Sequence, residues 1–351
     1  MRRVEVSSHL SPQLLHILQT LLDVDATLIQ AAWKDCSQTG RGYFVHTITQ
    51  AHGKKRQIHH PTQHMKLLQR RILSQVLYRL PVAQAAYGGV PGRSYVAAAR
   101  VHLQSAGHVV QLDIQDAFAH TSYGRISKYL RRVLKPHLWT FGLEAQQRQT
   151  LVGFLTHMMV VSPQGGRFPS LPLGTPTSLA LFNVMWAPID SQIKQTLKQL
   201  MPQQDIRYTR YVDDLTISSD QELHKDTIAR IHHIVKEHGY TLNQDKIKSA
   251  MREQACIHGL CWKDGHLSLP DQQVLRIAKR IHQLQALRVK HPTPQEWQEA
   301  YLLLQEVQNL LIHVYGQGPY PRGLHIQDDL IALIKSNIDQ NNARWAQELW
   351  G

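Results

Sequence analysis

The chain has 351 residues, with 39 Lys and Arg against 26 Asp and Glu, and a formal net charge of +13. Such an excess of positive charge favours a phosphate-rich partner such as a nucleic acid, although ribosomes and anionic membranes also attract basic chains. The sequence has no apolar stretch of about 18 residues or more and no apolar signal region near Met1, so we expect a soluble, cytoplasmic protein without a membrane partner.

Helical periodicity appears in two segments of the first 80 residues. The first pattern predicts a helix from about Pro12 to Ala32. The second predicts a helix from about Gln63 to Leu80, which ends before Pro81 because proline cannot continue a helix. Arg70 and Arg71 lie off its apolar stripe, where they would form a solvated face or contact phosphate.

Two acidic positions follow predicted strands. The largely apolar run 108–112 predicts a buried strand that ends at Asp113, a residue that could also simply cap a turn. Segments 206–211 and 215–218 predict a hairpin with Asp213 and Asp214 in its tight turn. Adjacent carboxylates repel each other, and a divalent cation relieves that repulsion. An isolated Asp-Asp turn can otherwise simply be solvated.

A shared metal site requires these segments to meet. If the strand that ends at Asp113 pairs beside the hairpin, Asp113 and Asp213 can hold two Mg²⁺ ions about 4 Å apart. This arrangement activates an attacking hydroxyl and stabilises a departing phosphate. Because the two residues are far apart in the sequence, only a tertiary fold can unite them.

The C-terminal third combines cysteines with helical segments. Cys36, Cys256 and Cys261 do not form a disulfide framework, and we expect free buried thiols. A zinc site with His258 and His266 is disfavoured, because the gap between the two later cysteines lies on a predicted strand pair. Helical patterns then occupy about 271–289, 294–315 and 326–349. The sequence has no internal repeat, so a solenoid is not expected.

Three segments, in the right order, resemble the catalytic motifs of reverse transcriptases of the bacterial retron type. Residues 112–118 resemble the first motif, 171–183 the second, nucleotide-positioning motif, and 210–218 the third. Further similarity to fingers, Gly-rich and fourth-motif segments is found at 54–61, 67–73, 86–94 and 241–246. The resemblance covers about residues 50 to 270 and is densest in the palm.

The resemblance implies an α+β fold, a right-hand polymerase with fingers, a palm made of an antiparallel sheet plus helices, and a helical thumb. Residues 1–105 would form N-terminal helices and fingers. Residues 106–255 would form the palm, with part of the fingers inserted at about 122–170, and residues 256–351 the pre-thumb strands and helical thumb.

The implied function is RNA-directed synthesis of cDNA from an associated structured non-coding RNA, by two-metal nucleotidyl transfer, in bacterial antiviral defence. Its partners would be that RNA as template and primer, its cDNA, dNTPs and a defence effector protein, with two Mg²⁺ as cofactors and Mn²⁺ as a substitute. The alternatives are a group II intron-like polymerase, a template-independent polymerase of the abortive-infection type, and a non-catalytic nucleic-acid-binding scaffold. Three intact carboxylates favour an enzyme, because a scaffold has no physical need for them.

The resemblance also assigns the chemistry to particular residues. The catalytic carboxylates would be Asp113, Asp213 and Asp214, and these would hold the metals together with the main-chain carbonyl of Ile114. Nucleotide binding would involve Lys55, Arg56, Phe118, Gly174 and Lys246. Within that set, the Phe118 ring would reject a 2′-hydroxyl, Lys55 and Arg56 would hold the triphosphate, and Lys246 would balance or protonate the pyrophosphate.

RNA contacts are expected from both ends of the chain, at Arg70, Arg71, His102, Lys279 and Arg280. Two retron signatures are altered. The family's Asn-Ala-x-x-His stretch begins here with Ala98, and its Val-Thr-Gly is Ile257-His258-Gly259. Leu173 also replaces the Gln that many relatives carry. The first two changes concern which RNA is recognised, and the third concerns nucleotide affinity or fidelity.

Overall fold

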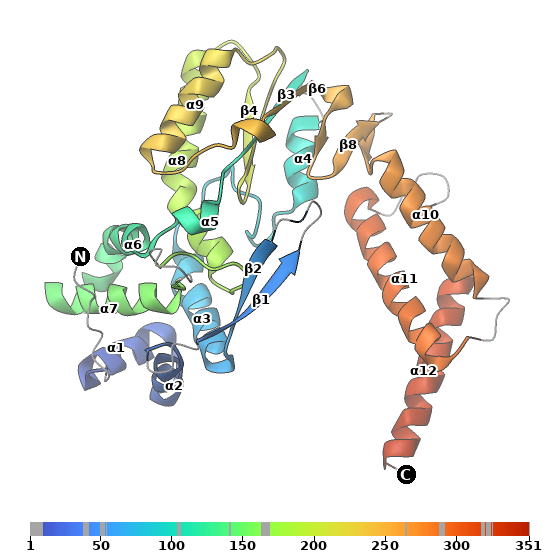
Figure 1. Cartoon of the computed structure of the whole chain (residues 1–351), viewed down its shortest axis with the longest axis horizontal. Helices are drawn as coiled ribbons and strands as arrows, with labels where there is room; N and C mark the ends of the chain where they lie inside the picture. Colours follow the sequence, from blue (N-terminus) through green and yellow to red (C-terminus); the bar gives the residue numbers. More distant parts are fainter. Residues whose placement is uncertain are drawn as a thin grey trace. The chain divides into compact units, whose positions relative to one another are not determined.

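A computed structural model describes residues 10–37, 42–49, 53, 55–103, 107–139, 142–162, 169–263, 265–287, 292–316, 320, 324 and 326–350 (Figure 1). Lys54, part of the predicted fingers segment, lies outside the described residues. The chain divides into two compact units, one of residues 1–98 and 110–248 and the other of residues 99–109 and 249–351. The finer division into fingers, palm and thumb stays a prediction.

The N-terminal region contains two helices where the sequence predicted one. Helix α1 (Pro12–Leu22) and helix α2 (Ala26–Ser37) are separated at Asp23, whose φ of 53° is left-handed. Aspartate tolerates this conformation better than most residues, so it can end a helix inside a continuous apolar pattern. The prediction of one helix was therefore wrong.

Helix α3 (Gln63–Gln75) packs against α1, α2 and α7 and is capped by the side chain of Thr62. It ends earlier than predicted, and a short 3₁₀ turn (Leu77–Arg79) follows. Just before it, strands β1 (Tyr43–Thr49) and β2 (Lys55–Pro61) form an antiparallel hairpin.

Four strands form a sheet with the order β4-β5-β3-β6. Strand β3 (His108–Asp113) is mostly buried, as its apolar composition predicted. Strands β4 (Arg207–Tyr211) and β5 (Asp214–Ser219) form the predicted antiparallel hairpin, and β6 (Lys248–Met251) is the edge strand. The sequence thus correctly predicted both the strand and the hairpin.

Helices surround this sheet, and the longest of them, α8 (Ser178–Leu200), has 12 buried residues that include Phe182 and Trp186. A single hydrophobic cluster extends from α1 to Leu242. The other helices of this part of the chain are α4 (Tyr95–Leu103), α5 (Ala117–His120), α6 (Tyr123–Trp139), α7 (Ala145–Met158) and α9 (Lys225–Glu237). Helices together with antiparallel strand pairs confirm the α+β class.

The second unit contains short strands followed by helices. Strands β7 (Cys256–Ile257), β8 (Leu260–Lys263) and β9 (His266–Ser268) form an antiparallel sheet. Helices α10 (Asp271–Ala286), α11 (Pro294–Tyr315) and α12 (Asp328–Trp350) follow, close to the predicted bounds. No helix among the described ranges is both long and apolar enough to cross a membrane.

The prediction of free thiols was wrong for two of the three cysteines. Cys256 and Cys261 are directly opposite each other in the β7–β8 register, with Cα atoms 4.3 Å apart, and they form a disulfide. This separation is that of a close antiparallel pair, in which two side chains on the same face can be bridged. Cys36 is a free thiol.

Candidate active site

The acidic turn between β4 and β5 has an unusual backbone conformation. Tyr211 and Asp214 are the last residues paired across the hairpin, so Val212 and Asp213 form the turn itself. Val212 has a φ of 59°, which is rare for a β-branched residue. Gly88 lies directly against it, because a Cβ built there would be 2.6 Å from Val212 Cγ2 and 2.8 Å from Val212 N.

Main-chain hydrogen bonds connect this turn to the end of β3. The amide of Ile114 donates to the carbonyl of Asp213 at 2.9 Å. The carbonyl of Asp113 in turn accepts from the amide of Asn243, in the predicted fourth motif, at 2.8 Å. The structure therefore brings together Asp113 and Asp213, which are separated in the sequence, as the two-strand hypothesis required.

The three carboxylates influence one another electrostatically. Desolvation chiefly, together with the negative charge of Asp113, raises the pKa of Asp213, while a backbone hydrogen bond and the charges of Arg56 and Lys246 oppose that rise. Desolvation, Asp213 and Asp113 together raise the pKa of Asp214 to about 6. Lys246 pairs with Asp113, with Nζ 2.6 Å from Oδ1. The ionised forms are thus disfavoured unless positive charge is nearby.

The donor set fits a hard divalent cation. Carboxylate oxygens and backbone carbonyls are ligands that Mg²⁺ binds in proteins, and the site offers three carboxylates that act on one another electrostatically, with Ile114 directly after Asp113. In the described part of the chain, however, no three His, Cys, Asp or Glu side chains converge as a ready-made metal site.

Three of the expected nucleotide-binding residues, Lys55, Arg56 and Gly174, come from two segments that contact each other. Lys55 and Arg56 are exposed on β2, and the charge of Arg56 acts on Asp213. Further along β2, the amide of His59 donates to the carbonyl of Leu173 at 2.8 Å. Gly174 follows with a φ of 95°, and a Cβ there would be 2.6 Å from Ile58 Cγ2. Glycine is therefore required at this point by both conformation and space.

Phe118 is half-buried in α5, and its ring stacks on that of Phe182, with centroids 5.3 Å apart. Phe182 is fully buried and also contacts Trp186 and Tyr240. The predicted sugar-discriminating ring thus has a rigid aromatic support behind it.

The residues expected to bind RNA have different environments. Arg70 lines a cavity of about 380 Å³ together with Lys66 of the same helix and Gly174 of the second motif. Arg71 instead donates to the carbonyls of Leu22 and Asp23, and so caps the end of α1. This contact gives Arg71 a structural role that the sequence did not predict.

The remaining expected RNA contacts lie in the second unit. His102 is fully buried in α4, so its ring is not accessible to RNA in this structure. On α10, Lys279 is exposed, and Arg280 pairs with Glu306 of α11 at 3.0 Å.

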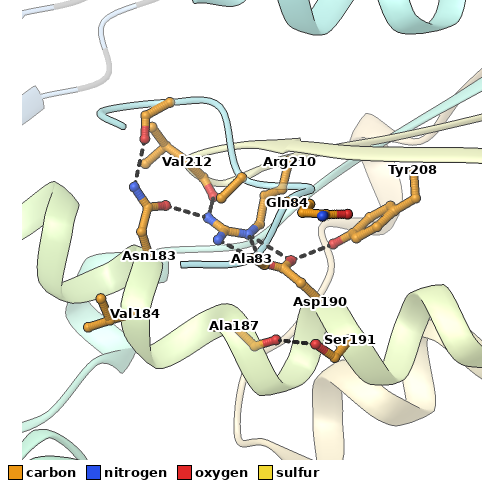
Figure 2. Close-up of polar contacts among 12 residues, drawn as sticks. Ala83, Gln84, Asn183, Val184, Ala187, Asp190, Ser191, Tyr208, Arg210 and Val212 are labelled. Atoms are coloured by element: carbon orange, nitrogen blue, oxygen red, sulfur yellow. Dashed lines mark hydrogen bonds and ion pairs between the residues drawn. The ribbon is translucent and has the colours of Figure 1, made fainter. Parts of the chain in front are cut away.

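Sequence reasoning missed a buried polar network beneath the turn (Figure 2). Arg210 and Asp190 form an ion pair at 2.8 Å, with side chains 0% and 1% exposed. Tyr208 donates to Asp190, and Arg210 donates to Asn183 and to the carbonyl of Val212. Two opposite charges, each inside an otherwise buried element, were the signal that could have predicted this pair.

Comparisons with known proteins show the family of the chain. The sequence profile of the family described as "Reverse transcriptase (RNA-dependent DNA polymerase)" matches residues 48–264, and the chain belongs to that family. Within it, the chain is similar to bacterial retron enzymes, which confirms the retron-type resemblance.

Two relatives and one solved structure illustrate the similarity. Retron Mx162 reverse transcriptase of Myxococcus xanthus is 32% identical over 228 residues, which cover 61% of this chain and 45% of that protein. Retron Ec73 reverse transcriptase of Escherichia coli is 26% identical over 176 residues, which cover 50% of this chain and 52% of that protein. The chain therefore spans about half the length of these curated relatives. Telomerase from Candida albicans superposes with a TM-score of 0.42 at 12% identity, over 86% of this chain and 61% of that one, which is too distant to carry an argument.

Proposed function

We propose that this chain is an RNA-directed DNA polymerase that uses two divalent metal ions and copies an associated structured non-coding RNA. The observation that carries the proposal is the hydrogen bond from Ile114 to Asp213, because it holds the first-motif and third-motif carboxylates side by side. Family membership supports the same chemistry.

The residues have separate roles in this proposal. Two Mg²⁺ would be held by Asp113, Asp213, Asp214 and the carbonyl of Ile114, and would supply activation of the primer hydroxyl and stabilisation of the departing pyrophosphate. Lys55 and Arg56 bind the triphosphate, and Phe118 rejects a ribose. Lys246, which pairs with Asp113, would balance charge on the pyrophosphate.

The proposal also includes an RNA partner and a cellular role. The net charge of +13 and the cavity next to Arg70 favour a phosphate-rich partner. The relatives are retron reverse transcriptases, and we propose by analogy a structured RNA as template and primer. A cytoplasmic location and a role in antiviral defence with an effector protein are further parts of the proposal.

A primer-extension assay with primed RNA, dNTPs and Mg²⁺ tests the polymerase. We expect the wild-type protein to extend the primer, and Asp213→Asn to lose this activity at least about 100-fold while it keeps its melting temperature. Asp220→Asn is the matched control, because Asp220 is an exposed carboxylate just beyond β5. A folded wild-type protein without synthesis on any primed RNA would favour the non-catalytic scaffold.

Sequencing the nucleic acids that copurify with the chain tests the RNA partner. One RNA species joined to a discrete cDNA would support the retron assignment. Long repetitive or untemplated DNA would instead favour a template-independent polymerase of another defence system.

A further inference from the structure

The conformation of the acidic turn is not explained by its own sequence. Val212 is β-branched, and its backbone has a left-handed conformation. Such a conformation is kept only where contacts with the surrounding structure stabilise it. Its neighbour Asp213 follows directly, so the peptide between the two sets the direction of the Asp213 backbone. Whatever holds the Val212 carbonyl therefore influences where the Asp213 carboxylate lies.

Arg210 holds that carbonyl. One Nη1 donates both to Val212 O and to Asn183 Oδ1, each at 3.0 Å. The opposite edge of the guanidinium donates two hydrogen bonds to Asp190, from Nε to Oδ1 at 2.9 Å and from Nη2 to Oδ2 at 2.8 Å. Figure 2 shows the guanidinium between Asn183 and Asp190, which both come from α8. Because guanidinium is planar, fixing one edge fixes the direction of the other.

The same network also ties the turn to the Gly-rich segment. Asn183 Nδ2 donates to the carbonyl of Gly88 at 2.8 Å, and Gly88 packs directly on Val212. The Arg210 backbone pairs with the same segment, through Ala85 O at 2.7 Å and Tyr87 N at 2.8 Å. The turn is therefore held by residues of helix α8, strand β4 and the Gly-rich segment.

We propose that Arg210 is a positioning residue that sets the geometry of the metal-binding turn. The peptide before Asp213 is held by Arg210, and the carbonyl of Asp213 is held by Ile114. The effect on metal binding rests on the proposed function, whereas the effect on turn geometry does not.

Two variants test the proposal. Arg210→Lys keeps a positive charge opposite Asp190 but loses the second donor edge that reaches Val212. The triple variant Asp190→Leu/Tyr208→Phe/Arg210→Met removes the buried charges and the hydroxyl that depends on them, and apolar replacements of a buried pair usually preserve folding. Arg207→Met is the matched control, since Arg207 lies on the same strand and pairs with Asp205 near the surface.

The first measurement is hydrogen–deuterium exchange of the metal-free proteins, which needs neither catalysis nor a cation. We expect faster exchange in both Arg210 variants over residues 211–214 and at Ile114, with α8 and β3 otherwise protected as in the wild type. Unchanged exchange at the turn in the folded triple variant would overturn the proposal, whether or not the chain proves to be a polymerase.

The second measurement is binding of Mn²⁺ alone, followed by its electron paramagnetic resonance signal. Residues that orient metal ligands typically change metal affinity 10–100-fold, so we expect about tenfold weaker binding in both Arg210 variants and none in Arg207→Met. Full wild-type affinity in Arg210→Lys would show that charge balance with Asp190 suffices, and would overturn the positioning role.

Discussion

At the scale of single residues, the support behind Phe118 has a functional consequence. Its ring is backed by the fully buried Phe182, so it cannot withdraw when a bulkier sugar approaches. We expect Phe118→Ala to raise the efficiency of ribonucleotide incorporation, relative to deoxyribonucleotide, by at least about tenfold. Single-nucleotide extension with matched dNTP and rNTP measures this ratio.

Tyr78→Ala is a suitable control for that experiment, because Tyr78 is an exposed aromatic residue outside the site. Its sugar selectivity should equal that of the wild type. If Phe118→Ala retains wild-type selectivity while extending primers normally, the ring is only a core residue.

At the scale of elements, the contact between the Gly-rich segment and the acidic turn predicts a sharp steric effect. In Gly88→Ala, the new Cβ would lie 2.8 Å from the Val212 nitrogen, a backbone atom that cannot rotate away. We expect a loss of about 1–3 kcal/mol in unfolding free energy and a large loss of primer extension. Chemical denaturation and the extension assay measure the two effects.

Gly124→Ala provides the opposite case within helix α6, where nothing lies within 4 Å of the added Cβ. Because Gly124 is in the first turn of the helix, its replacement by alanine should leave the protein as stable as the wild type or stabilise it by up to about 0.5 kcal/mol. Equal effects of the two substitutions would contradict the steric account of Gly88.

The local elements of the fold were predictable, whereas their tertiary relations were less so. The hairpin around Asp213 and the strand that ends at Asp113 follow from short apolar patterns, which depend on neighbours in the sequence. The break at Asp23 was missed because the apolar periodicity continues across it, and only a backbone angle interrupts it. The Cys256–Cys261 bond was missed because it depends on the exact register of two short strands.

The candidate site shows the same division. The hydrogen bond between Ile114 and Asp213 agrees with the expected proximity of Asp113 and Asp213, whereas the catalytic role of the carboxylates stays a prediction. The resemblance could not show that Arg71 caps α1 or that Arg210 pairs with Asp190, because each contact joins segments distant in the sequence.

At the scale of the whole molecule, the net charge of +13 predicts salt-sensitive RNA binding. For single strands, each phosphate contact contributes about −0.7 to the slope of log K against log salt concentration. We expect Arg70→Gln to reduce the magnitude of this slope by about 0.7, because Arg70 lines a cavity with a second cation, Lys66. Fluorescence anisotropy with a labelled RNA over a salt series measures it.

Arg71→Gln is the neighbouring control. Since Arg71 is bound to the end of α1, its loss should lower the melting temperature and leave the salt slope unchanged. If Arg71→Gln reduced the salt slope and Arg70→Gln did not, Arg71 and not Arg70 would be the residue that contacts phosphate.

Helix α8 has a mechanical consequence for the molecule. Its first turn is hydrogen-bonded to the second-motif loop: Ser178 Oγ donates to Pro172 O at 2.6 Å and is 2.6 Å from Thr175 Oγ1. Its middle carries Asn183 and Asp190, which clamp the acidic turn through Arg210. The loop that would contact the nucleotide and the turn that would hold the metals therefore move as one rigid body. Strand β2 is hydrogen-bonded to the same loop through His59 and Leu173, so Lys55 and Arg56 are anchored to this body as well.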